Sequence, residues 1–309
     1  MIALFGPTGV GKTAVALALA ERLRRRGEDP VAVSADALQV YRGLETLTGA
    51  AGAAEQALLE HRLLSFVDPR ETFSAGEYAA RAHEEIDSAL EAGRRPIVVG
   101  GTGLYLQAAL TDLELRPPAE AAVRRRIEAE LAARGPEALH VELAARDPTA
   151  ARAIDPRDRT RVARALELLE MGEEPVGEES RLWIARLRHP TLLFGLTMER
   201  KALYERIDAR VNEIVAGGAA GEVRRAEAAG ASRTARAALG FEELLAGDVE
   251  AMKRRTRNYA KRQLTWLRRL PELHEIDLTG GTPQAAAGAI AHILAGRPRE
   301  ASHPPGKDP

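Results

Sequence analysis

The N-terminal pattern G-x-x-x-x-G-K-T at residues 6–13 constrains the fold of this chain more than any other feature. The run Ile2 to Phe5 predicts a buried strand before it, and Ala14 to Arg24 predict a helix after it. In this strand–loop–helix context, backbone N–H groups and the helix N-terminus form a cradle for phosphate. We expect phosphate-binding roles for Gly6, Thr8, Gly9, Gly11, Lys12 and Thr13, with the Thr13 hydroxyl as a metal-ligand position.

Composition excludes several classes of protein. The 309 residues include no cysteine, which rules out disulfides, thiolate metal sites and a cysteine nucleophile. An intracellular, cytoplasmic protein is the simplest interpretation. No uninterrupted apolar run approaches the length needed to span a membrane, so a soluble protein without a membrane partner is expected.

A carboxylate follows the second predicted strand. Val31 to Ser34 read as a short buried strand, and Asp36 comes just after it. Ligands gather at the carboxyl ends of parallel strands, so Asp36 should face the same crevice as the phosphate loop. A helix cap or turn former is the alternative for a lone Asp at this place. The nearby polar residues Gln39, Tyr41 and Arg42 favour a functional site, because they are suited to hold a substrate.

The strand Ile97 to Val99 ends without an acidic residue. Many phosphate-loop proteins that hydrolyse nucleotides place an Asp there for magnesium and water, so its absence argues against a motor or switch ATPase. Thr102 instead offers a hydroxyl near the expected position of Asp36. A helix cap is an equally good interpretation of this threonine.

The order of predicted elements indicates an α/β fold, a P-loop NTPase-like parallel sheet flanked by helices, with an inserted all-helical domain. We expect residues 1–116 to form the first part of the core and residues 190–290 the second part. Residues 117–189 read as the helical insertion, and residues 291–309 as a disordered tail. The insertion contains a dense mixture of arginines and aspartates near Thr160, which is typical of a solvated face.

Two arginines on one predicted helix are candidates for anion binding. Arg206 and Arg210 lie one turn apart, and a guanidinium pair can grip a pyrophosphate group in a bidentate way. Salt bridges to Glu205 or Glu213 are the alternative.

A basic helix is predicted from Val249 to Leu270. The stretch from Ala251 to Pro271 carries lysines and arginines but no acidic residue. Apolar residues recur every seven positions and predict a core-facing stripe, which consists of Met252, Tyr259 and Trp266. A second face carries Lys253, Arg257 and Lys261. Such a face can contact a nucleic acid backbone or can simply be solvated.

Several segments are specific in combination and occur in a fixed order: GPTGVGKT, SADALQVYRG, HRLLSFVDPRETFSAGEY, VVGGTGLYLQAAL, RTRVARALE, LYERIDARV and TRNYAKRQLTWLRR. Over Met1 to Leu270 the chain resembles the bacterial tRNA dimethylallyltransferase family, also called the IPP transferase family. It departs from the family pattern at Leu44 to Ala51, which puts contacts made by that segment in doubt.

The resemblance implies transfer of a dimethylallyl group from dimethylallyl diphosphate to the exocyclic N6 of the adenosine on the 3′ side of the anticodon. It implies that Asp36 is the general base, that Thr102 orients it, and that Arg210 stabilises the leaving diphosphate. Lys12, and Thr13 together with Mg²⁺, would stabilise the same leaving diphosphate. The tRNA anticodon stem-loop would be contacted by Asp36, Ala37, Leu38, Gln39, Thr160, Arg161, Arg164, Lys253, Arg257 and Lys261.

Two other functions are open at this stage. A small-molecule kinase that uses ATP would also place an Asp after its second strand, but it would have little need for a cationic C-terminal helix. A non-enzymatic nucleotide switch that binds RNA is disfavoured by the missing acid after Val99. A monomer is the expected form, although nothing in the sequence determines the oligomeric state.

Overall fold

The computed structural model describes residues 1–113, 116, 118–175 and 186–296. The chain divides into two compact units, which we call the core unit and the helical unit. Met1–Asp112 and Leu187–Pro309 form the core unit, and Leu113–Arg186 form the helical unit. Among the described helices, none is long and apolar enough to cross a membrane.

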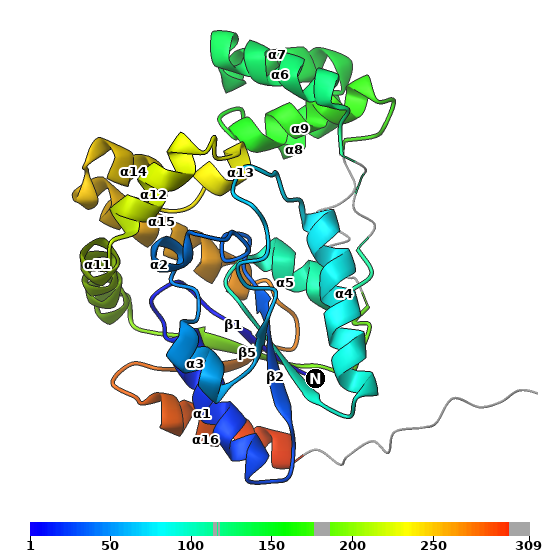
Figure 1. Ribbon diagram of the computed structural model, residues 1–309. Coiled ribbons are helices and arrows are strands. Elements are labelled where there is room, and N and C mark those ends of the chain that lie inside the picture. The colour runs from blue at the N-terminus through cyan, green and yellow to red at the C-terminus, as the bar shows by residue number, and fades with distance from the viewer. Residues whose placement is uncertain (114–115, 117, 176–185, 297–309) are drawn as a thin grey trace, which may run out of the picture. The chain divides into compact units, whose positions relative to one another are not determined.

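A six-stranded parallel sheet forms the centre of the core unit (Figure 1), with strand order β3-β2-β4-β1-β5-β6. Its strands are β1 (Ile2–Phe5), β2 (Pro30–Ala35), β3 (His61–Arg62), β4 (Arg95–Gly100), β5 (Leu192–Thr197) and β6 (His274–Asp277). All residues of β1 and β2 are buried. Strands buried on both faces are nearly continuous apolar runs, which explains why β1 could be predicted from its sequence.

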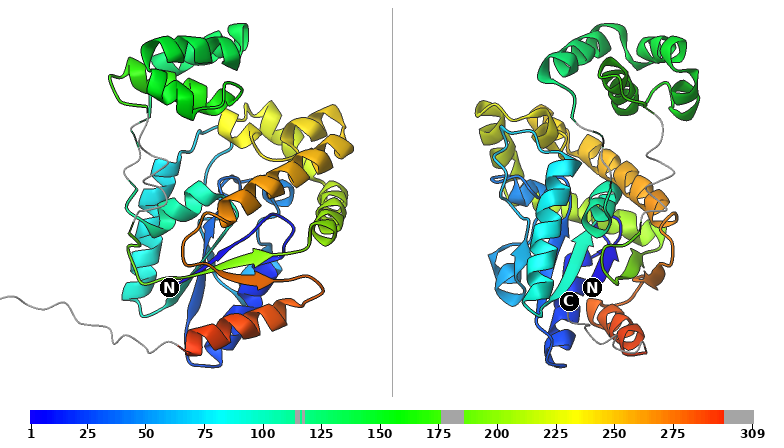
Figure 2. Two further views of the ribbon diagram at one scale, coloured as in Figure 1. Left: turned by 180° about the vertical axis from the view of Figure 1, so that it is seen from behind. Right: turned by 90° about the vertical axis from the view of Figure 1, so that its right-hand side faces the viewer.

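Helices cover both faces of this sheet (Figures 1 and 2). The helices of the core unit are α1 (Lys12–Arg24), α2 (Glu45–Thr48), α3 (Ala53–Leu58), α4 (Ala75–Glu91), α5 (Gly103–Leu110), α11 (Arg200–Ala216), α12 (Ala219–Ala228), α13 (Arg233–Arg236), α14 (Phe241–Ala246), α15 (Val249–Leu267) and α16 (Pro283–Ala295). Helix α1 packs beside α16, and α4 packs beside α5 on the opposite face. Right-handed crossovers require this division, because the chain moves across the sheet in opposite directions after β1 and after β3.

The helical unit has a hydrophobic core of its own. Its helices are α6 (Ala121–Arg134), α7 (Pro136–Arg146), α8 (Pro148–Ala153) and α9 (Arg159–Glu170). Leu139, Leu143, Val162 and Leu166 are fully buried among them. A separate core is what makes a segment a domain, so the helical interpretation of this stretch agrees with its packing.

The boundaries differ from the expected ones by a few residues. Residues 187–189 belong to the core unit because the backbone N–H of Arg188 donates to the Leu110 carbonyl at 2.9 Å. The Arg188 guanidinium and His189 Nε2 also contact the carboxylate of Asp87 on α4, at 2.9 and 2.7 Å. At the C-terminus α16 continues to Ala295, so the expected tail beginning at residue 291 started too early. Residues 297–309 lie outside the described residues.

Candidate active site

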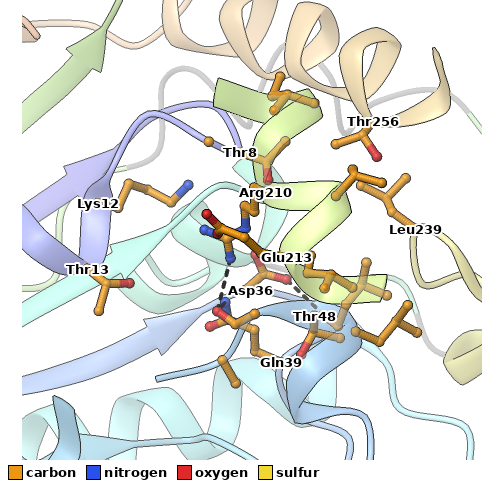
Figure 3. Close-up of a pocket in the computed structure, with 18 of the residues that line it drawn as sticks. Thr8, Lys12, Thr13, Asp36, Gln39, Thr48, Arg210, Glu213, Leu239 and Thr256 are labelled. Atoms are coloured by element: carbon orange, nitrogen blue, oxygen red, sulfur yellow. Dashed lines mark hydrogen bonds between the residues drawn. The ribbon is translucent and has the colours of Figure 1, made fainter. Parts of the chain in front are cut away.

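A cavity of about 480 Å³ opens at the carboxyl edge of the sheet (Figure 3). The phosphate loop and the residues after β2 form one side, and α2, α11 and α15 form the others. Figure 3 shows Lys12, Asp36 and Arg210 converging on this space from three different elements. The structure therefore brings together three charged groups that are far apart in the sequence.

The phosphate loop has the backbone that its glycines predict. Gly9 and Gly11 have φ values of 82° and 103°, in the left-handed region that favours glycine. Five of the six predicted phosphate-binding residues line the cavity: Thr8, Gly9, Gly11, Lys12 and Thr13. Gly6 does not line it, but its carbonyl accepts a hydrogen bond from Lys12 Nζ at 2.9 Å.

Lys12 is held by the loop itself. Its Nζ also donates to the Pro7 carbonyl at 3.1 Å, so the ammonium lies against carbonyl oxygens of its own loop. Burial is the main cause that lowers the pKa of Lys12 to about 8; nearby Asp36 opposes this change and Arg210 adds to it. A bound anion would favour the charged form of this lysine, because opposite charges at close range stabilise each other.

Asp36 makes the contact of a turn-forming residue and also lies at the cavity wall. Its Oδ1 accepts a hydrogen bond from Leu38 N at 3.0 Å, which is the contact of a turn-forming aspartate. The same residue lines the cavity, together with Leu38 and Gln39. The turn therefore fixes the carboxylate at the cavity wall.

Two neighbours of Asp36 do not reach the cavity. Tyr41 is only 1% exposed, and its hydroxyl donates to Thr234 Oγ1 at 2.6 Å. Arg42 donates to the Phe66 carbonyl at 3.3 Å. The expectation that Tyr41 holds a substrate was wrong, because its side chain is buried and bonded within the fold; the exposed Arg42 lies outside the cavity, and its contact with a substrate stays a prediction.

Thr102 is at the N-cap of α5, yet its side chain makes no capping hydrogen bond. Its Oγ1 instead accepts from Ala37 N at 3.4 Å and lies 3.3 Å from the hydroxyl of Tyr259. Thr102 is thus connected to the residue after Asp36. Burial raises the pKa of Tyr259 to about 12, so its hydroxyl keeps its proton at neutral pH.

Arg210 reaches the cavity from α11. Its Nη2 donates to the Gly49 carbonyl at 3.1 Å. Burial lowers the pKa of the Arg210 guanidinium, and Asp36, Glu55 and Glu213 oppose that change. Arg206 lines the same cavity one turn earlier, so the predicted pair does face a common space. A guanidinium held at a carbonyl keeps further N–H groups for a second acceptor.

The segment that departs from the family pattern holds Arg210. Residues 45–48 form α2, whose first backbone N–H groups are capped by the buried carboxylate of Glu222. Its two oxygens accept from Thr46 N at 3.0 Å and Leu47 N at 2.9 Å. The other end of α2 presents the Gly49 carbonyl to Arg210. The segment therefore has a definite place at the site, although its sequence is unusual.

The remaining predicted tRNA-binding residues lie outside the cavity. Thr160, Arg161 and Arg164 belong to the first two turns of α9 in the helical unit, where Thr160 and Arg161 are exposed. On α15, Arg257 donates to Asp208 at 2.6 Å and Lys253 to Glu250 at 2.8 Å. The side chain of Lys261 is exposed, with Nζ 3.5 Å from Asn258 Oδ1.

Three residues at this site were missed or interpreted differently from the sequence. Gln263 bridges the phosphate loop to the loop after β4, and Gly49 holds Arg210. Tyr259 was assigned to a core stripe, but it lines the cavity. The sequence did contain a sign that Gln263 is functional. Gln263 belongs to the specific segment KRQLTWLR and is a polar residue that interrupts the apolar stripe of the helix.

The donor set suits a magnesium ion that is shared with a ligand. The described residues contain no group of three or more His, Cys, Asp or Glu side chains that could hold a metal. Mg²⁺ keeps several waters and takes phosphate oxygens and only one or two protein ligands. Thr13 at the start of α1 lines the cavity and offers such a hydroxyl ligand.

Comparisons with known proteins agree with this geometry. A family model described as IPP transferase matches residues 39–270. The tRNA dimethylallyltransferase of Bradyrhizobium sp. strain BTAi1 is 40% identical over 94% of this chain and 97% of its own length. That of Thermobifida fusca is also 40% identical, over 89% and 88% of the two chains.

Solved structures give the same result. A tRNA isopentenylpyrophosphate transferase from Bacillus halodurans shares 34% identity, with a TM-score of 0.68 over 96% of this chain and 95% of that one. A eukaryotic dimethylallyltransferase, solved acting on tRNA, shares 25% identity and has a TM-score of 0.74 over 98% of this chain and 81% of that one.

The fold and the cavity define a P-loop α/β protein that places a carboxylate beside a phosphate cradle. The chain belongs to the IPP transferase family, the tRNA dimethylallyltransferases. The relatives named above are dimethylallyl- or isopentenylpyrophosphate transferases of tRNA, so the comparisons do not favour the small-molecule kinase.

The contact between Gly49 and Arg210 can be tested with a matched pair of glycine variants. A Cβ on Gly49 would lie 1.9 Å from Arg210 Nη2, whereas a Cβ on Gly43 would meet nothing within 4 Å. Both glycines have positive φ, 58° and 78°, so both variants carry similar backbone strain. Gly49→Ala should displace the guanidinium and weaken binding of inorganic pyrophosphate by about tenfold or more, while Gly43→Ala should not. Calorimetric titration measures both affinities, and equal losses would contradict this role of Gly49.

The lowered pKa of Lys12 predicts a pH dependence of anion binding. Pyrophosphate stabilises the charged lysine, so binding raises its pKa above the value of about 8 in the free protein. The contribution of Lys12 to the affinity for pyrophosphate should be constant below pH 8 and should fall as the pH rises through 8. Binding in that range should be accompanied by proton uptake. Titrations in buffers of different ionisation enthalpy measure that uptake. Lys12→Arg stays charged and should take up fewer protons at pH 9; the same uptake as in the unmodified protein would show that another group titrates.

Proposed function

We propose that this protein transfers a dimethylallyl group from dimethylallyl diphosphate to the exocyclic N6 of the adenosine on the 3′ side of the tRNA anticodon. The observation that carries the proposal is the shared cavity. Within it, the carboxylate of Asp36 lies with the phosphate loop and Arg210, so a base for the acceptor and a cradle for the leaving group have a common space. The names and the tRNA-bound structure of the relatives support this reaction for the family.

The residues divide into two groups with separate roles. An adenine amine is a weak nucleophile because its lone pair is delocalised into the ring, so Asp36 accepts its proton as the new C–N bond forms. The C–O bond of the donor breaks, and diphosphate leaves with the electron pair. Loop N–H groups, Lys12 and Arg210 stabilise the charge on that leaving group. Thr102 would support the acceptor side through its contact with Ala37 N.

Mg²⁺ fits the diphosphate side of the cavity. Thr13 supplies a hydroxyl ligand and the diphosphate supplies oxygens, which is the ligand set that this ion accepts. When bound, the ion would neutralise charge on the leaving diphosphate.

The acceptor is the anticodon stem-loop of tRNA. Thr160 and Arg161 are exposed in the first turn of α9, where Asp158 caps the helix and lies 3.4 Å from the Arg161 guanidinium, so the guanidinium and the Thr160 hydroxyl would be the groups that meet a phosphate. Arg164, Lys253, Arg257 and Lys261 would extend the contact with the backbone. Ala37, Leu38 and Gln39 would meet the target base, which must leave its stack to reach Asp36. A monomer in the cytoplasm would suffice for this reaction.

The direct test incubates the purified protein with unmodified tRNA, radiolabelled dimethylallyl diphosphate and Mg²⁺. Label should reach the tRNA. Asp36→Asn should lower the transfer rate by about a hundredfold or more, because a general base contributes roughly 10²–10⁴-fold. An amide can still accept from Leu38 N, so the turn and the affinity for the donor should survive. Absence of label with folded unmodified protein would sink the proposed function, and loss of donor binding in Asp36→Asn would assign Asp36 a different role.

The salt dependence of tRNA binding tests the basic helix. Lys253 and Arg257 have acidic partners, so exposed Lys261 is the cleaner position for charge reversal. Lys261→Glu should weaken tRNA binding and lower the slope of log affinity against log salt by about 0.7–0.9. The control is Arg26→Glu, an equal charge change just beyond the far end of α1, about 20 Å from the loop, where Arg26 donates to the Ala291 carbonyl and not to a carboxylate. Equal effects of the two variants would show that the basic face of α15 is solvated and does not contact tRNA.

A further inference from the structure

Gln263 on α15 connects the phosphate loop with the loop after β4. The proposed reaction requires that these two loops keep a fixed relative position. Its Oε1 accepts a hydrogen bond from Thr8 N in the phosphate loop at 2.8 Å. Its Nε2 donates to the Gly101 carbonyl, in the loop after β4, at 2.7 Å. The residue is only 3% exposed, so one amide group spans the space between these loops with both of its ends satisfied.

A side chain added at Gly101 would not fit at this junction without displacing a neighbour. A Cβ on Gly101 would lie 2.3 Å from Gln263 Nε2, and 3.2 Å from both Gly6 O and Lys12 Nζ. Distances this short mean that the backbone of the β4 loop packs directly on the phosphate loop and on the Gln263 amide. The amide therefore links the two loops where their backbones are already close, and its two hydrogen bonds align one loop with the other.

Each loop leads to a different reactant. Thr8 lines the cavity within the phosphate cradle, which would hold the donor. Gly101 precedes Thr102, whose hydroxyl accepts from Ala37 N beside Asp36, on the acceptor side. Tyr259, one turn before Gln263 on α15, lies 3.3 Å from the same hydroxyl. One face of α15 thus touches both sides of the cavity.

We propose that Gln263 is a positioning residue that fixes the distance between the donor diphosphate and the acceptor side at Asp36 and Thr102. The proposal rests on the proposed function. Bond formation between two bound reactants is sensitive to their separation, and a misplacement of about 1 Å can cost about a hundredfold in rate. Holding the phosphate alone is less sensitive, because the loop N–H groups, Lys12 and Arg210 all remain.

Two variants test this role against a purely structural one. Gln263→Met has similar length but loses both hydrogen bonds. Gln263→Glu keeps an acceptor for Thr8 N but turns a carboxylate oxygen toward the Gly101 carbonyl. Each should lower the single-turnover transfer rate by about 10- to 100-fold, while the dissociation constant for inorganic pyrophosphate changes less than about threefold in Gln263→Met. The control is Gln107→Met, the same change at a buried glutamine of α5.

A double-mutant cycle tests the contact itself. Gly101→Ala displaces the Gln263 amide, so its effect on the transfer rate should be large alone and at least about threefold smaller in a Gln263→Ala background. Additive effects would overturn the proposal. A rate loss in Gln263→Met that is matched by Gln107→Met, or that follows an equal loss of pyrophosphate affinity, would also overturn it. If the unmodified protein transfers no label, the proposed function is wrong. That result can be distinguished from the outcomes above, which all require an active unmodified protein.

Discussion

The candidate site depends on keeping two cations in a desolvated cavity, Lys12 and Arg210, although no described carboxylate forms a salt bridge with either. Lys12 and Arg210 both have lowered pKa values because of burial, and Asp36 is the acid that opposes the change in each case. Isolated charges are costly to remove from water, so such a site is stable only when carbonyl groups or an anion compensate them. Here the carbonyls of Gly6, Pro7 and Gly49 do so. A cavity arranged in this way favours a multiply charged anion such as diphosphate.

Local sequence patterns were sufficient to predict the main strands and helices of the core and the phosphate loop of the site. The phosphate loop is specified by eight consecutive residues, and helix α4 follows the N-cap Ser74, whose capping box with Glu77 is a local sequence pattern. The contacts that complete the cavity are not local. Gln263 and Thr8 are 255 positions apart, and Arg210 and Gly49 are 161 apart. Both partners of such a hydrogen bond look ordinary in the sequence, because each acquires its role only when the sheet brings them together.

Helix α15 shows that a periodic pattern can predict which residues share one face of a helix, but not what that face contacts in the folded protein. Met252, Tyr259 and Trp266 do share a face, and Met252 is buried as predicted, but Tyr259 meets the cavity and Thr102. The basic stripe is equally ambiguous, since Asp208, which pairs with Arg257, comes from α11. Charge spacing on one helix cannot reveal an acid that a second helix supplies. The periodicity therefore predicted the orientation of α15 but not the chemistry on each side of it.

These two faces give α15 a part in both halves of the proposed reaction. Thr256, Tyr259 and Gln263 are spaced by three and four residues and line the cavity, whereas Lys261 lies on an exposed face. A helix is a stiff element, so a tRNA backbone that binds the exposed face is held at a set distance from the phosphate loop that Gln263 contacts. A kinase with a small acceptor has no use for this connection. An enzyme that joins a five-carbon donor to one base of a large RNA needs it, because the target adenine must be positioned against the donor that the phosphate loop holds.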